Sequence, residues 1–585
     1  MLTLGISAYY HDAAACLIRD GQIVGAVQEE RFTRRKYDAD LPVNAVRYCL
    51  DQAGATIADV DRLAFYEVPA DKRERQKWQR ARRTGAAPAR PSADDTEMRL
   101  RDGLHWTGEI HFVPHHHAHA ASAYHVSGFG DAAVLVCDAV GEWDTTSFWS
   151  GRGPELTRLG DVRFPHSLGL FYSCLTSYLG YRPNSDEYKV MGLASYGTPK
   201  YEPELRRLLA VDEAAGRFTL DTGVMDFLSE PEGYLRNLAE LLGLPPRRHG
   251  EPVLAHHADV AASGQAVLES AVTSLLHWLS ERQESANLCL AGGVALNCRA
   301  NAVAFDRSRF TRLFVQPAAG DAGTALGAAL CAEMSASPEP SVPPAMRHAY
   351  LGPRYDGDGI TRMLSAACIR FEEFGDEAGL LEAVAAALAA GRTMGWFQGR
   401  MEFGPRALGA RSILADPRTA RMRDRLNADI KWREEFRPFA PAVLEERAQE
   451  FFSMDRTSPF MIDLFSVRRP DLLGAVTHVD GTARVQTVNA SVAPRFHGLI
   501  RRFGELTGVP VLLNTSFNLS DEPIVCTPVD ALRTFLRSSL DLLCLENVLV
   551  DAREIGEGLR EAAREEHRFV AGAGLQTGRE VYSFF

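Results

Sequence analysis

Three short apolar segments of the sequence each end in a turn built from small residues and polar side chains. The apolar runs and their turns are 132–137 with 138–142, 288–291 with 292–297, and 313–317 with 320–323. Glycine in such turns lets a ligand approach the backbone closely, and free N–H groups at the start of a following helix attract phosphate. Because helical stretches such as 259–279 lie between the strands, the pattern predicts an α/β fold with a nucleotide site at the strand ends.

A proline-rich segment at 335–345 divides the chain of 585 residues. Its four prolines within seven residues exclude helix and sheet interior and predict an extended connector. We therefore expect two domains, 1–340 and 346–585, each long enough to bury its own core.

Each domain has recognisable local elements. The first opens with apolar strands joined through Asp20 and Gly21, a strong hairpin signal. The second is expected to contain a helix at 376–390, a strand at 393–397 and a further strand at 509–513.

Composition is that of a soluble globular protein, with 46% hydrophobic and 24% charged residues. The net charge of −12 argues against a general partnership with nucleic acid or anionic membranes. The ten cysteines form no CxxC pair and no secretory leader is expected, so we predict a reducing, cytoplasmic location. The longest apolar stretch, near 383–390, is too short to span a membrane. A basic cluster at 71–102 is expected to be a solvated insertion, with a clamp for an anionic substrate as the alternative.

Four histidines fall within the five positions that begin at His115. Pro114 suits the first turn of a helix, in which His115 and His119 share one face. Two imidazoles at this spacing can bind one divalent ion, and Asp138 and Asp321 can complete the ligand set. Nitrogen and oxygen ligands without a thiolate permit iron, manganese or zinc. The alternative is a buried histidine cluster with aspartates that cap helices.

Arginine and lysine recur among glycine, proline and phenylalanine in the second half of the chain, at 399–417, at 431–441 and at Arg484. Guanidinium groups beside rigid turns can bind small oxyanions through paired hydrogen bonds. This pattern predicts a phosphate or carboxylate pocket, with surface salt bridges as the alternative. Asn514 and Ser516 add neutral groups at a strand end that could hold a ribose, a phosphate or a carbamoyl amide.

Several motifs together resemble those of the NodU/CmcH-type O-carbamoyltransferases, which modify nodulation factors, aminoglycosides, cephamycins and macrolides. The motifs are EERFTRRK at 29–36, the histidine run, YKVMGLASYG at 188–197, AGGVALN, GDAGTALGAA, FGPRALGARSILADPR, FRPFAP and NTSFN. They cover nearly the whole chain. The resemblance implies a first domain with the split nucleotide-binding fold of actin and sugar kinases, similar to the metal-binding transferase that makes threonylcarbamoyl-adenosine in tRNA. It implies a second domain that is YrdC-like.

The resemblance also implies a two-step, ATP-dependent activity. The second domain would form carbamoyl-adenylate from carbamoyl phosphate and ATP with Mg²⁺. The first would transfer the carbamoyl group to a hydroxyl of a small natural product and release AMP. A homodimer is a further implication, and iron is the foremost candidate for the metal.

Carried over by matching motif, the resemblance assigns residues to each role. The catalytic pair would be His11 and Asp12, beside the metal ligands His115, His119, Asp138 and Asp321. The nucleotide or the intermediate would contact Lys36, Gly141, Glu142, Lys189, Gly292, Gly293, Asn297 and Gly320. Carbamoyl phosphate and the adenylate would contact Arg406, Lys431, Arg437, Arg484, Asn514 and Ser516. One departure is Ala139, which stands where relatives commonly have glycine in the first turn.

Two other functions remain open from the residues. One is a sugar-kinase-like phosphotransferase, which would release ADP rather than AMP and pyrophosphate. The other is a non-enzymatic, nucleotide-dependent regulator. A tRNA-modifying transferase is disfavoured by the acidic composition.

Overall fold

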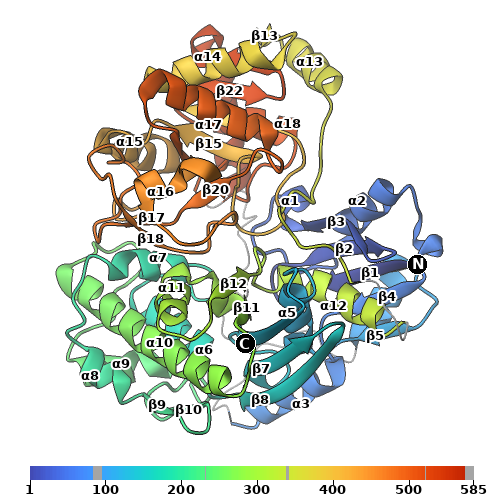
Figure 1. Cartoon of the computed structure of the whole chain (residues 1–585), viewed down its shortest axis with the longest axis vertical. Coiled ribbons are helices and arrows are strands. Elements are labelled where there is room, and N and C mark those ends of the chain that lie inside the picture. The colour runs from blue at the N-terminus through green and yellow to red at the C-terminus, as the bar shows by residue number, and fades with distance from the viewer. Residues whose placement is uncertain (83–94, 231, 337–341, 521, 573–585) are drawn as a thin grey trace. The chain divides into compact units, whose positions relative to one another are not determined.

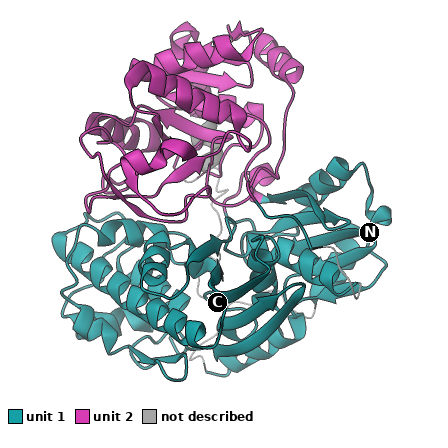
Figure 2. Ribbon diagram, in the orientation of Figure 1, with its two compact units in different colours: residues 1–29, 37–346, 579–585 teal, residues 30–36, 347–578 magenta. Residues whose placement is uncertain are grey.

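The computed structural model of the chain describes residues 1–82, 95–230, 232–336, 342–520 and 522–572 (Figure 1). These residues form two compact units: unit 1 comprises 1–29 and 37–346, and unit 2 comprises 30–36 and 347–572 (Figure 2). Part of the expected connector, 337–341, lies outside the described residues. We expected residues 30–36 in the first domain, and this part of the expectation is wrong because they pack with unit 2.

The first sheet of unit 1 has the order β3-β2-β1-β4-β5. Its strands are β1 (Leu2–Ser7), β2 (Ala14–Arg19), β3 (Gln22–Gln28), β4 (Arg62–Phe65) and β5 (Ile110–Phe112). The predicted hairpin is confirmed between β2 and β3, where Asp20 and Gly21 have φ of 50° and 77°. Positive φ at both positions is what a two-residue hairpin turn requires. β1, β4 and β5 run parallel, so their C-terminal ends lie at one edge.

The second sheet of unit 1 has the order β12-β11-β6-β7-β8. Its strands are β6 (Asp131–Cys137), β7 (Asp144–Arg152), β8 (Glu155–Arg163), β11 (Asn287–Ala291) and β12 (Arg312–Val315), and a separate hairpin joins β9 (Leu209–Asp212) to β10 (Arg217–Leu220). The three strands predicted at the start of the sequence analysis are confirmed as β6, β11 and β12. They are parallel neighbours, so the turns that follow them lie side by side.

The helices of unit 1 cover both sheets (Figure 1). They are α2 (Val43–Ala53), α3 (Pro69–Arg80), α4 (Thr96–Leu104), α5 (His115–Tyr124), α6 (Leu168–Tyr178), α7 (Glu187–Ala194), α8 (Glu202–Arg206), α9 (Gly233–Leu242), α10 (Ala255–Glu281), α11 (Cys298–Asp306) and α12 (Ala322–Met334). The helix predicted at 259–279 is confirmed as α10. α12 packs on β1, where glycine permits direct backbone contact: a Cβ on Gly5 would lie 2.0 Å from Ala325 O.

The basic segment at 71–102 is only partly the solvated insertion that we expected. α3 buries Lys72 and Arg75. Lys72 Nζ lies 2.8 Å from both carboxylate oxygens of Glu67, and the Arg75 guanidinium lies over the Phe164 ring. A long basic side chain can be buried when its stem packs and its charge is paired. Residues 83–94 lie outside the described part of the chain.

Unit 2 is built on a sheet with the order β13-β23-β22-β14-β15-β21-β16-β20. These strands are β13 (Glu372–Glu373), β14 (Met394–Phe397), β15 (Arg411–Ala415), β16 (Ala440–Leu444), β20 (Gln486–Val488), β21 (Val511–Ser516), β22 (Leu542–Leu545) and β23 (Val548–Asp551). A smaller sheet joins β17 (Phe452–Ser453), β18 (Phe465–Val467) and β19 (Thr482–Ala483). The predicted strands 393–397 and 509–513 are confirmed as β14 and β21, the latter beginning two residues later.

Successive strand residues point to opposite faces of this sheet, and each face carries its own core. Trp396 belongs to the cluster that includes α14 and α17, whereas Phe397 belongs to the cluster that includes α18. The helices of unit 2 are α1 (Glu30–Thr33), α13 (Gly357–Ala366), α14 (Glu377–Ala389), α15 (Ala420–Arg425), the π-helical turn η4 (Leu426–Lys431), α16 (Ala448–Phe451), α17 (Pro494–Thr507), α18 (Pro528–Arg537) and α19 (Glu557–Gly572). The helix predicted at 376–390 is confirmed as α14.

The fold class is mixed α/β, as predicted. Among the described residues, none of the helices is both long and apolar enough to cross a membrane.

Candidate functional site

The four side chains predicted as metal ligands converge in unit 1. One ligand atom from each of His115, His119, Asp138 and Asp321 lies within 4.8 Å of the others, and all four residues are buried. The two histidine Nε2 atoms are 3.1 Å apart, and His115 Nε2 is 3.1 Å from Asp138 Oδ2. Asp321 Oδ1 lies 3.7 Å from each of these nitrogens.

The fold brings the four residues together from both sheets. β5 leads into α5, which presents His115 and His119 one turn apart on the same face. β6 ends just before Asp138, and Asp321 immediately precedes α12. α5 and α12 approach each other so closely that a Cβ on Gly327 would lie 1.7 Å from Ala118 O. Helix contact therefore fixes the distance from Asp321 to the histidines.

The cluster has the donor set and spacing of a divalent-cation site. Ligand atoms about 2.0–2.2 Å from one ion are separated by roughly 3–3.6 Å; here the separations that involve a histidine nitrogen are 3.1–3.8 Å, and all four ligand atoms lie within 4.8 Å of one another. Within the described residues, buried Asp321 Oδ2 has no hydrogen-bond partner. An unpaired buried carboxylate oxygen is costly unless a cation compensates it. The residues present therefore fit iron, manganese or zinc.

The charges of the cluster reinforce one another. Burial lowers the pKa of His115, but the Asp321 and Asp138 carboxylates outweigh burial and raise it to about 9. Burial raises the pKa of Asp138, but His115 and His119 outweigh burial and hold it well below its usual range. Asp138 therefore stays ionised, as metal binding requires, whereas His115 must give up its proton when an ion binds.

The first predicted phosphate turn supports the cluster directly. Glu142 accepts hydrogen bonds from the backbone N–H of His115 at 3.0 and 3.2 Å and from that of Val68 at 2.7 Å. A Cβ on Gly141 would lie 3.0 Å from the His115 side chain. In this structure both residues position α5, and the Glu142 carboxylate is engaged by the protein backbone.

The second predicted turn holds one metal-ligand candidate in place. Asp138 Oδ1 accepts a 2.8 Å hydrogen bond from Gly293 N–H, which orients Oδ2 toward the histidines. Gly292 has φ of 89°, and a Cβ there would lie 2.1 Å from Cys137 O. Only glycine suits this approach of the turn to β6.

The remaining predicted nucleotide contacts have varied surroundings. Asn297 caps α11 by accepting from Ala300 N–H at 3.0 Å, and its amide exchanges hydrogen bonds with Gln265. Around Gly320 the turn is open, since a Cβ there would approach Leu296 Cδ1 at 4.0 Å.

The two lysines predicted to contact the nucleotide fall in different units. Lys189 on α7 pairs with Asp186 at 3.2 Å and lies over the Tyr181 ring in unit 1. Lys36 belongs to unit 2.

The predicted catalytic pair lies beside the metal-ligand cluster. His11 Nδ1 is 3.1 Å from Asp12 Oδ2, and His11 Nε2 is 3.9 Å from Asp321 Oδ2. Asp12 has φ of 53°, an unfavourable conformation for a non-glycine residue and one often found at functional sites. Burial lowers the pKa of His11, but Asp321 and Asp12 outweigh burial and raise it to about 9.

In unit 2 the structure joins Lys431 to Ser516. Lys431 ends the π-helical turn η4, and its buried ammonium donates to Ser516 O and to both Asn518 O and Asn518 Oδ1, the latter two at 2.9 Å. Ser516 Oγ donates to Asn518 Oδ1 at 2.7 Å. Asn518 therefore organises both predicted residues, although it was assigned no role of its own from the NTSFN motif.

The loop that carries Arg406 is fixed by a buried carboxylate. Glu402 Oε1 accepts hydrogen bonds from the backbone N–H groups of Leu408 at 2.6 Å, Ala410 at 2.7 Å and Arg411 at 3.2 Å. Charge-assisted bonds of this kind hold a loop in one conformation. The sequence contained no local signal for this role of Glu402.

Asn514 reaches the same loop from β21. Its Nδ2 donates to Gln486 Oε1 at 2.8 Å and to Ala407 O at 3.3 Å, and Gln486 Nε2 donates to Leu408 O at 2.8 Å. Within the described residues, Asn514 Oδ1 has no hydrogen-bond partner. Asn514 thus supports the Arg406 loop and retains one uncommitted acceptor.

Two other residues predicted to bind carbamoyl phosphate or the adenylate, Arg437 and Arg484, also belong to unit 2. Arg437 lies 3.7 Å from Glu434 and contributes to lowering the pKa of Lys431, which burial lowers most. Arg484 lies between β19 and β20.

Two arginines of the same glycine- and proline-rich stretch, Arg400 and Arg411, were assigned no ligand from the sequence. Arg411 is fully buried, donates to four backbone carbonyls at 3.0–3.2 Å and stacks 3.5 Å from the Phe397 ring. Arg400 donates to Leu351 O at 2.6 Å and Gly352 O at 3.2 Å. Both guanidinium groups bind the protein's own backbone.

Comparison with known proteins identifies the family. Residues 2–330 match the family model described as Carbamoyltransferase N-terminus, and residues 385–552 match the one described as Carbamoyltransferase C-terminus. The chain belongs to the carbamoyltransferase family. The resemblance to the NodU/CmcH-type enzymes is confirmed, and the protein is an enzyme that transfers carbamoyl groups.

Named relatives of this carbamoyltransferase cover most of its length. Nodulation protein NolNO of Sinorhizobium fredii is 40% identical over 94% of this chain and 80% of its own. The uncharacterized protein sll1178 of Synechocystis is 43% identical over 94% of this chain and 96% of its own. The 3'-hydroxymethylcephem-O-carbamoyltransferase of Amycolatopsis lactamdurans is 40% identical over 42% of this chain and 45% of its own.

Solved structures align weakly. HypF of T. kodakarensis covers 57% of this carbamoyltransferase and 48% of its own chain, at 16% identity and a TM-score of 0.31. The ROK hexokinase of Thermus thermophilus covers 57% and 98%, at 13% identity and a TM-score of 0.29. These scores are too low to assign a fold.

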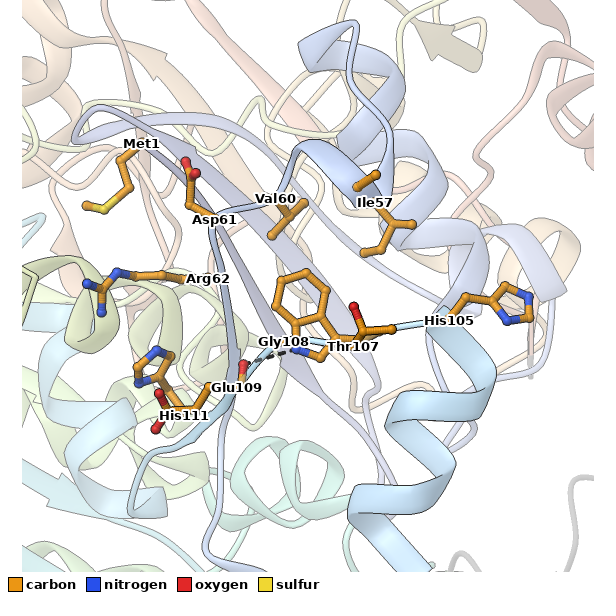
Figure 3. Close-up of a pocket in the computed structure, with 12 residues that line it drawn as sticks. Met1, Ile57, Val60, Asp61, Arg62, His105, Thr107, Gly108, Glu109 and His111 are labelled. Atoms are coloured by element: carbon orange, nitrogen blue, oxygen red, sulfur yellow. Dashed lines mark hydrogen bonds between the residues drawn. The ribbon is translucent and has the colours of Figure 1, made fainter.

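A cavity of about 910 Å³ lies in unit 1 of the carbamoyltransferase, and none of the predicted site residues lines it (Figure 3). It is bordered by β5 and by the start of β4. Its polar groups have local partners: Asp61 accepts from Leu2 N–H, and the Trp106 indole donates to Glu109 O. The cavity therefore shares no residue with the candidate site.

Proposed function

We propose that this carbamoyltransferase is an ATP-dependent O-carbamoyltransferase that modifies a hydroxyl group of a small natural product. The names of its relatives support an antibiotic-type or nodulation-type acceptor. The observation that carries the proposal is the convergence of His115, His119, Asp138 and Asp321 beside His11, in a chain whose other unit gathers Lys431, Ser516 and the Arg406 loop.

We assign carbamoyl-adenylate formation to unit 2. Water releases carbamate and phosphate from carbamoyl phosphate, and a carbamate oxygen then attacks the α-phosphorus of ATP bound with Mg²⁺, so that pyrophosphate leaves. The reactants are anionic throughout. Lys431 is held in place by Ser516 and Asn518, and a bound anion would favour its charged form against the burial that lowers its pKa, so binding needs little reorganisation of this side chain. Arg406, Arg437 and Arg484 would bind the phosphate oxygens.

We assign transfer to unit 1, with His11 accepting the proton of the acceptor hydroxyl. The base is the neutral form of His11, which the raised pKa makes the minor form near neutral pH: Nδ1 carries a proton and donates to Asp12 Oδ2, and Nε2 keeps its lone pair. General-base help of this kind typically contributes about 10²–10⁴-fold. The hydroxyl oxygen attacks the carbamoyl carbon, and AMP leaves.

His115, His119, Asp138 and Asp321 would hold a divalent ion, with iron foremost and manganese or zinc as alternatives. When bound, such an ion supplies positive charge for the phosphate of the leaving group. Glu142 and Gly293 keep two of these ligands in place through their backbone contacts.

The finer fold assignment is also part of the proposal. Parallel strands of both sheets in unit 1 deliver their C-terminal ends to one cluster, which supports an actin- and sugar-kinase-like arrangement. A YrdC-like unit 2, a homodimer and a cytoplasmic location remain predictions from the sequence.

The test is product analysis. Purified protein is incubated with ATP, carbamoyl phosphate and a panel of hydroxylated natural products, and mass spectrometry follows the mass of one carbamoyl group replacing one hydrogen. We expect the carbamoylated acceptor together with AMP and pyrophosphate. Release of ADP with a phosphorylated acceptor would instead establish the kinase, and no nucleotide turnover with any acceptor would favour the regulator.

A further inference from the structure

Residues 30–36 leave unit 1 and return to it at residue 37, but they pack with unit 2. They form the short helix α1 followed by Arg34, whose φ is 60°. A left-handed backbone at arginine costs free energy and persists only where the surroundings enforce it. The single domain boundary expected at 340–346 does not predict that residues 30–36 pack with unit 2.

Contacts of the Arg34 side chain hold the backbone in this left-handed conformation. Its two terminal nitrogens donate to Ile524 O and Pro523 O, each at 2.6 Å, and its Nε lies 3.7 Å from Asp530 Oδ1. A guanidinium can bind two adjacent carbonyls at once, whereas a lysine ammonium at the same place cannot match the fork. Arg34 therefore clamps the segment to the turn before α18.

Two further residues attach the segment to the loop that carries Arg406. Buried Arg31 donates to Gly404 O at 2.9 Å. Phe32 packs against a small apolar cluster of unit 2, which consists of Met401, Ala407, Ile524 and Cys526. The segment therefore has two attachments within unit 2. Arg31 and Phe32 contact the Arg406 loop and its apolar cluster, and Arg34 binds the carbonyls that precede α18.

Lys36 is carried by the same segment, two residues after Arg34. Burial lowers the pKa of Lys431 most strongly, followed by the charges of Arg433 and Arg437, and the charge of Lys36 acts in the same direction. Lys36 is therefore one of the unit 2 charges that bear on Lys431.

We propose that Arg34 is a positioning residue of the activating site: its clamp fixes residues 30–36 to unit 2, where they contact the loop that carries Arg406, and so positions Lys36 to bind the anionic reactants. This inference rests on the proposed function of unit 2. It makes the activating site a composite of residues from both ends of the chain.

The experiment uses the full-length protein and carbamoyl-phosphate-dependent exchange of pyrophosphate into ATP, which reports adenylate formation alone. Arg34→Ala should raise the KM for carbamoyl phosphate about tenfold or more, the loss expected for one charged contact. Arg34→Lys should show a similarly raised KM, because lysine cannot form the paired hydrogen bonds of the guanidinium. Arg34→Gly relaxes the backbone at φ 60° and removes the clamp, so it should behave like Arg34→Ala. The matched control is exposed Arg35→Ala, which removes the same charge one residue away and should keep a wild-type KM.

A double-mutant cycle separates positioning from a structural role. If Arg34 acts through Lys36, then Lys36→Ala alone and Lys36→Ala with Arg34→Ala should have the same KM. Additive effects of the two substitutions would overturn the proposal, as would a wild-type KM for Arg34→Ala.

Hydrogen exchange tests the clamp independently of activity. The amides of residues 30–36 should exchange at least about tenfold faster in Arg34→Ala than in Arg35→Ala, because the segment opens locally. Equal exchange in the two variants would overturn the proposal even if the wild type is active. A wild type without any carbamoyl-phosphate-dependent exchange would reject the proposed function, while the amide measurement would still decide whether Arg34 holds the segment.

Discussion

The contact between α5 and α12 can be tested with one methyl group. In Gly327→Ala, the new Cβ would lie 1.7 Å from Ala118 O, although real Cβ atoms essentially never approach within 3.0 Å of such an atom. Ala118 lies on α5 between His115 and His119, and the new contact is with backbone, so no side-chain rotation can relieve it. The two helices must move apart.

The size of the effect follows from two opposing terms. Overpacking of a core contact costs about 1–3 kcal/mol, and alanine gains about 1 kcal/mol over glycine in helix propensity. Because the clash is with backbone, we take the upper part of the first range and expect a net loss of about 1–2 kcal/mol in the free energy of unfolding. The same movement displaces Asp321 from the histidines, so metal affinity should fall as well.

The assay is urea unfolding followed by circular dichroism, together with metal titration of the purified protein. The control is Gly558→Ala, the same substitution in a helix where a Cβ meets nothing within 4 Å, and it should be neutral or stabilising. A Gly327→Ala variant with wild-type stability and wild-type metal affinity would refute the close approach of α5 and α12 and the argument built on it.

His119→Ala should remove most of the bound metal measured by elemental analysis, whereas His116→Ala should retain it because His116 Nδ1 bonds to Ser147 at 2.9 Å instead of facing the cluster. Equal metal content in the two variants would contradict the ligand assignment. Lys431→Met should abolish carbamoyl-phosphate-dependent pyrophosphate exchange while leaving stability unchanged or higher, since a buried charge is replaced by an apolar chain of similar volume. Burial holds the pKa of Lys431 below its usual 10.5, so the unfolded chain keeps a proton that the folded chain releases, and stability conferred by this group rises as pH increases toward 10.5. Unfolding measured across alkaline pH should therefore show a steeper rise for wild type than for Lys431→Met, and parallel curves would argue against a depressed pKa.

The metal-ligand cluster could be predicted because its geometry is local to regular elements. The separation of His115 and His119 by four residues fixes their common face once a helix forms. Asp138 directly follows the apolar strand β6. Asp321 follows the strand β12 and directly precedes helix α12. Parallel neighbours place such ends together. Periodicity and turn chemistry were sufficient here.

Partners of buried charges could not be predicted in the same way. Arg411 and Arg406 lie in the same glycine- and proline-rich motif, yet Arg411 binds four carbonyls of the protein. Lys72 looked like part of a solvated basic cluster, but it is paired with Glu67. Which carbonyl or carboxylate a long side chain meets depends on tertiary packing, and a single sequence carries no local record of it.

The partners of two buried glutamates, Glu142 and Glu402, also could not be predicted from the sequence. Glu142 was predicted to contact the nucleotide and Glu402 was assigned no role, but each is bonded to backbone N–H groups: Glu142 to His115 and Val68, and Glu402 to the loop that follows Arg406. A buried carboxylate is stable there because two or three charge-assisted bonds offset its desolvation. Its effect is therefore on the position of functional residues.

This assignment makes a paired prediction. Glutamine at either position keeps one acceptor oxygen but loses the charge, so each bond weakens and the attached segment shifts. Glu142→Gln should lower metal affinity and leave carbamoyl-phosphate-dependent exchange near wild type, because His115 belongs to the cluster in unit 1. Glu402→Gln should raise the KM for carbamoyl phosphate and leave metal content unchanged, because the Arg406 loop belongs to unit 2. If either substitution impaired both measurements equally, the glutamates would not act through the segments that they hold.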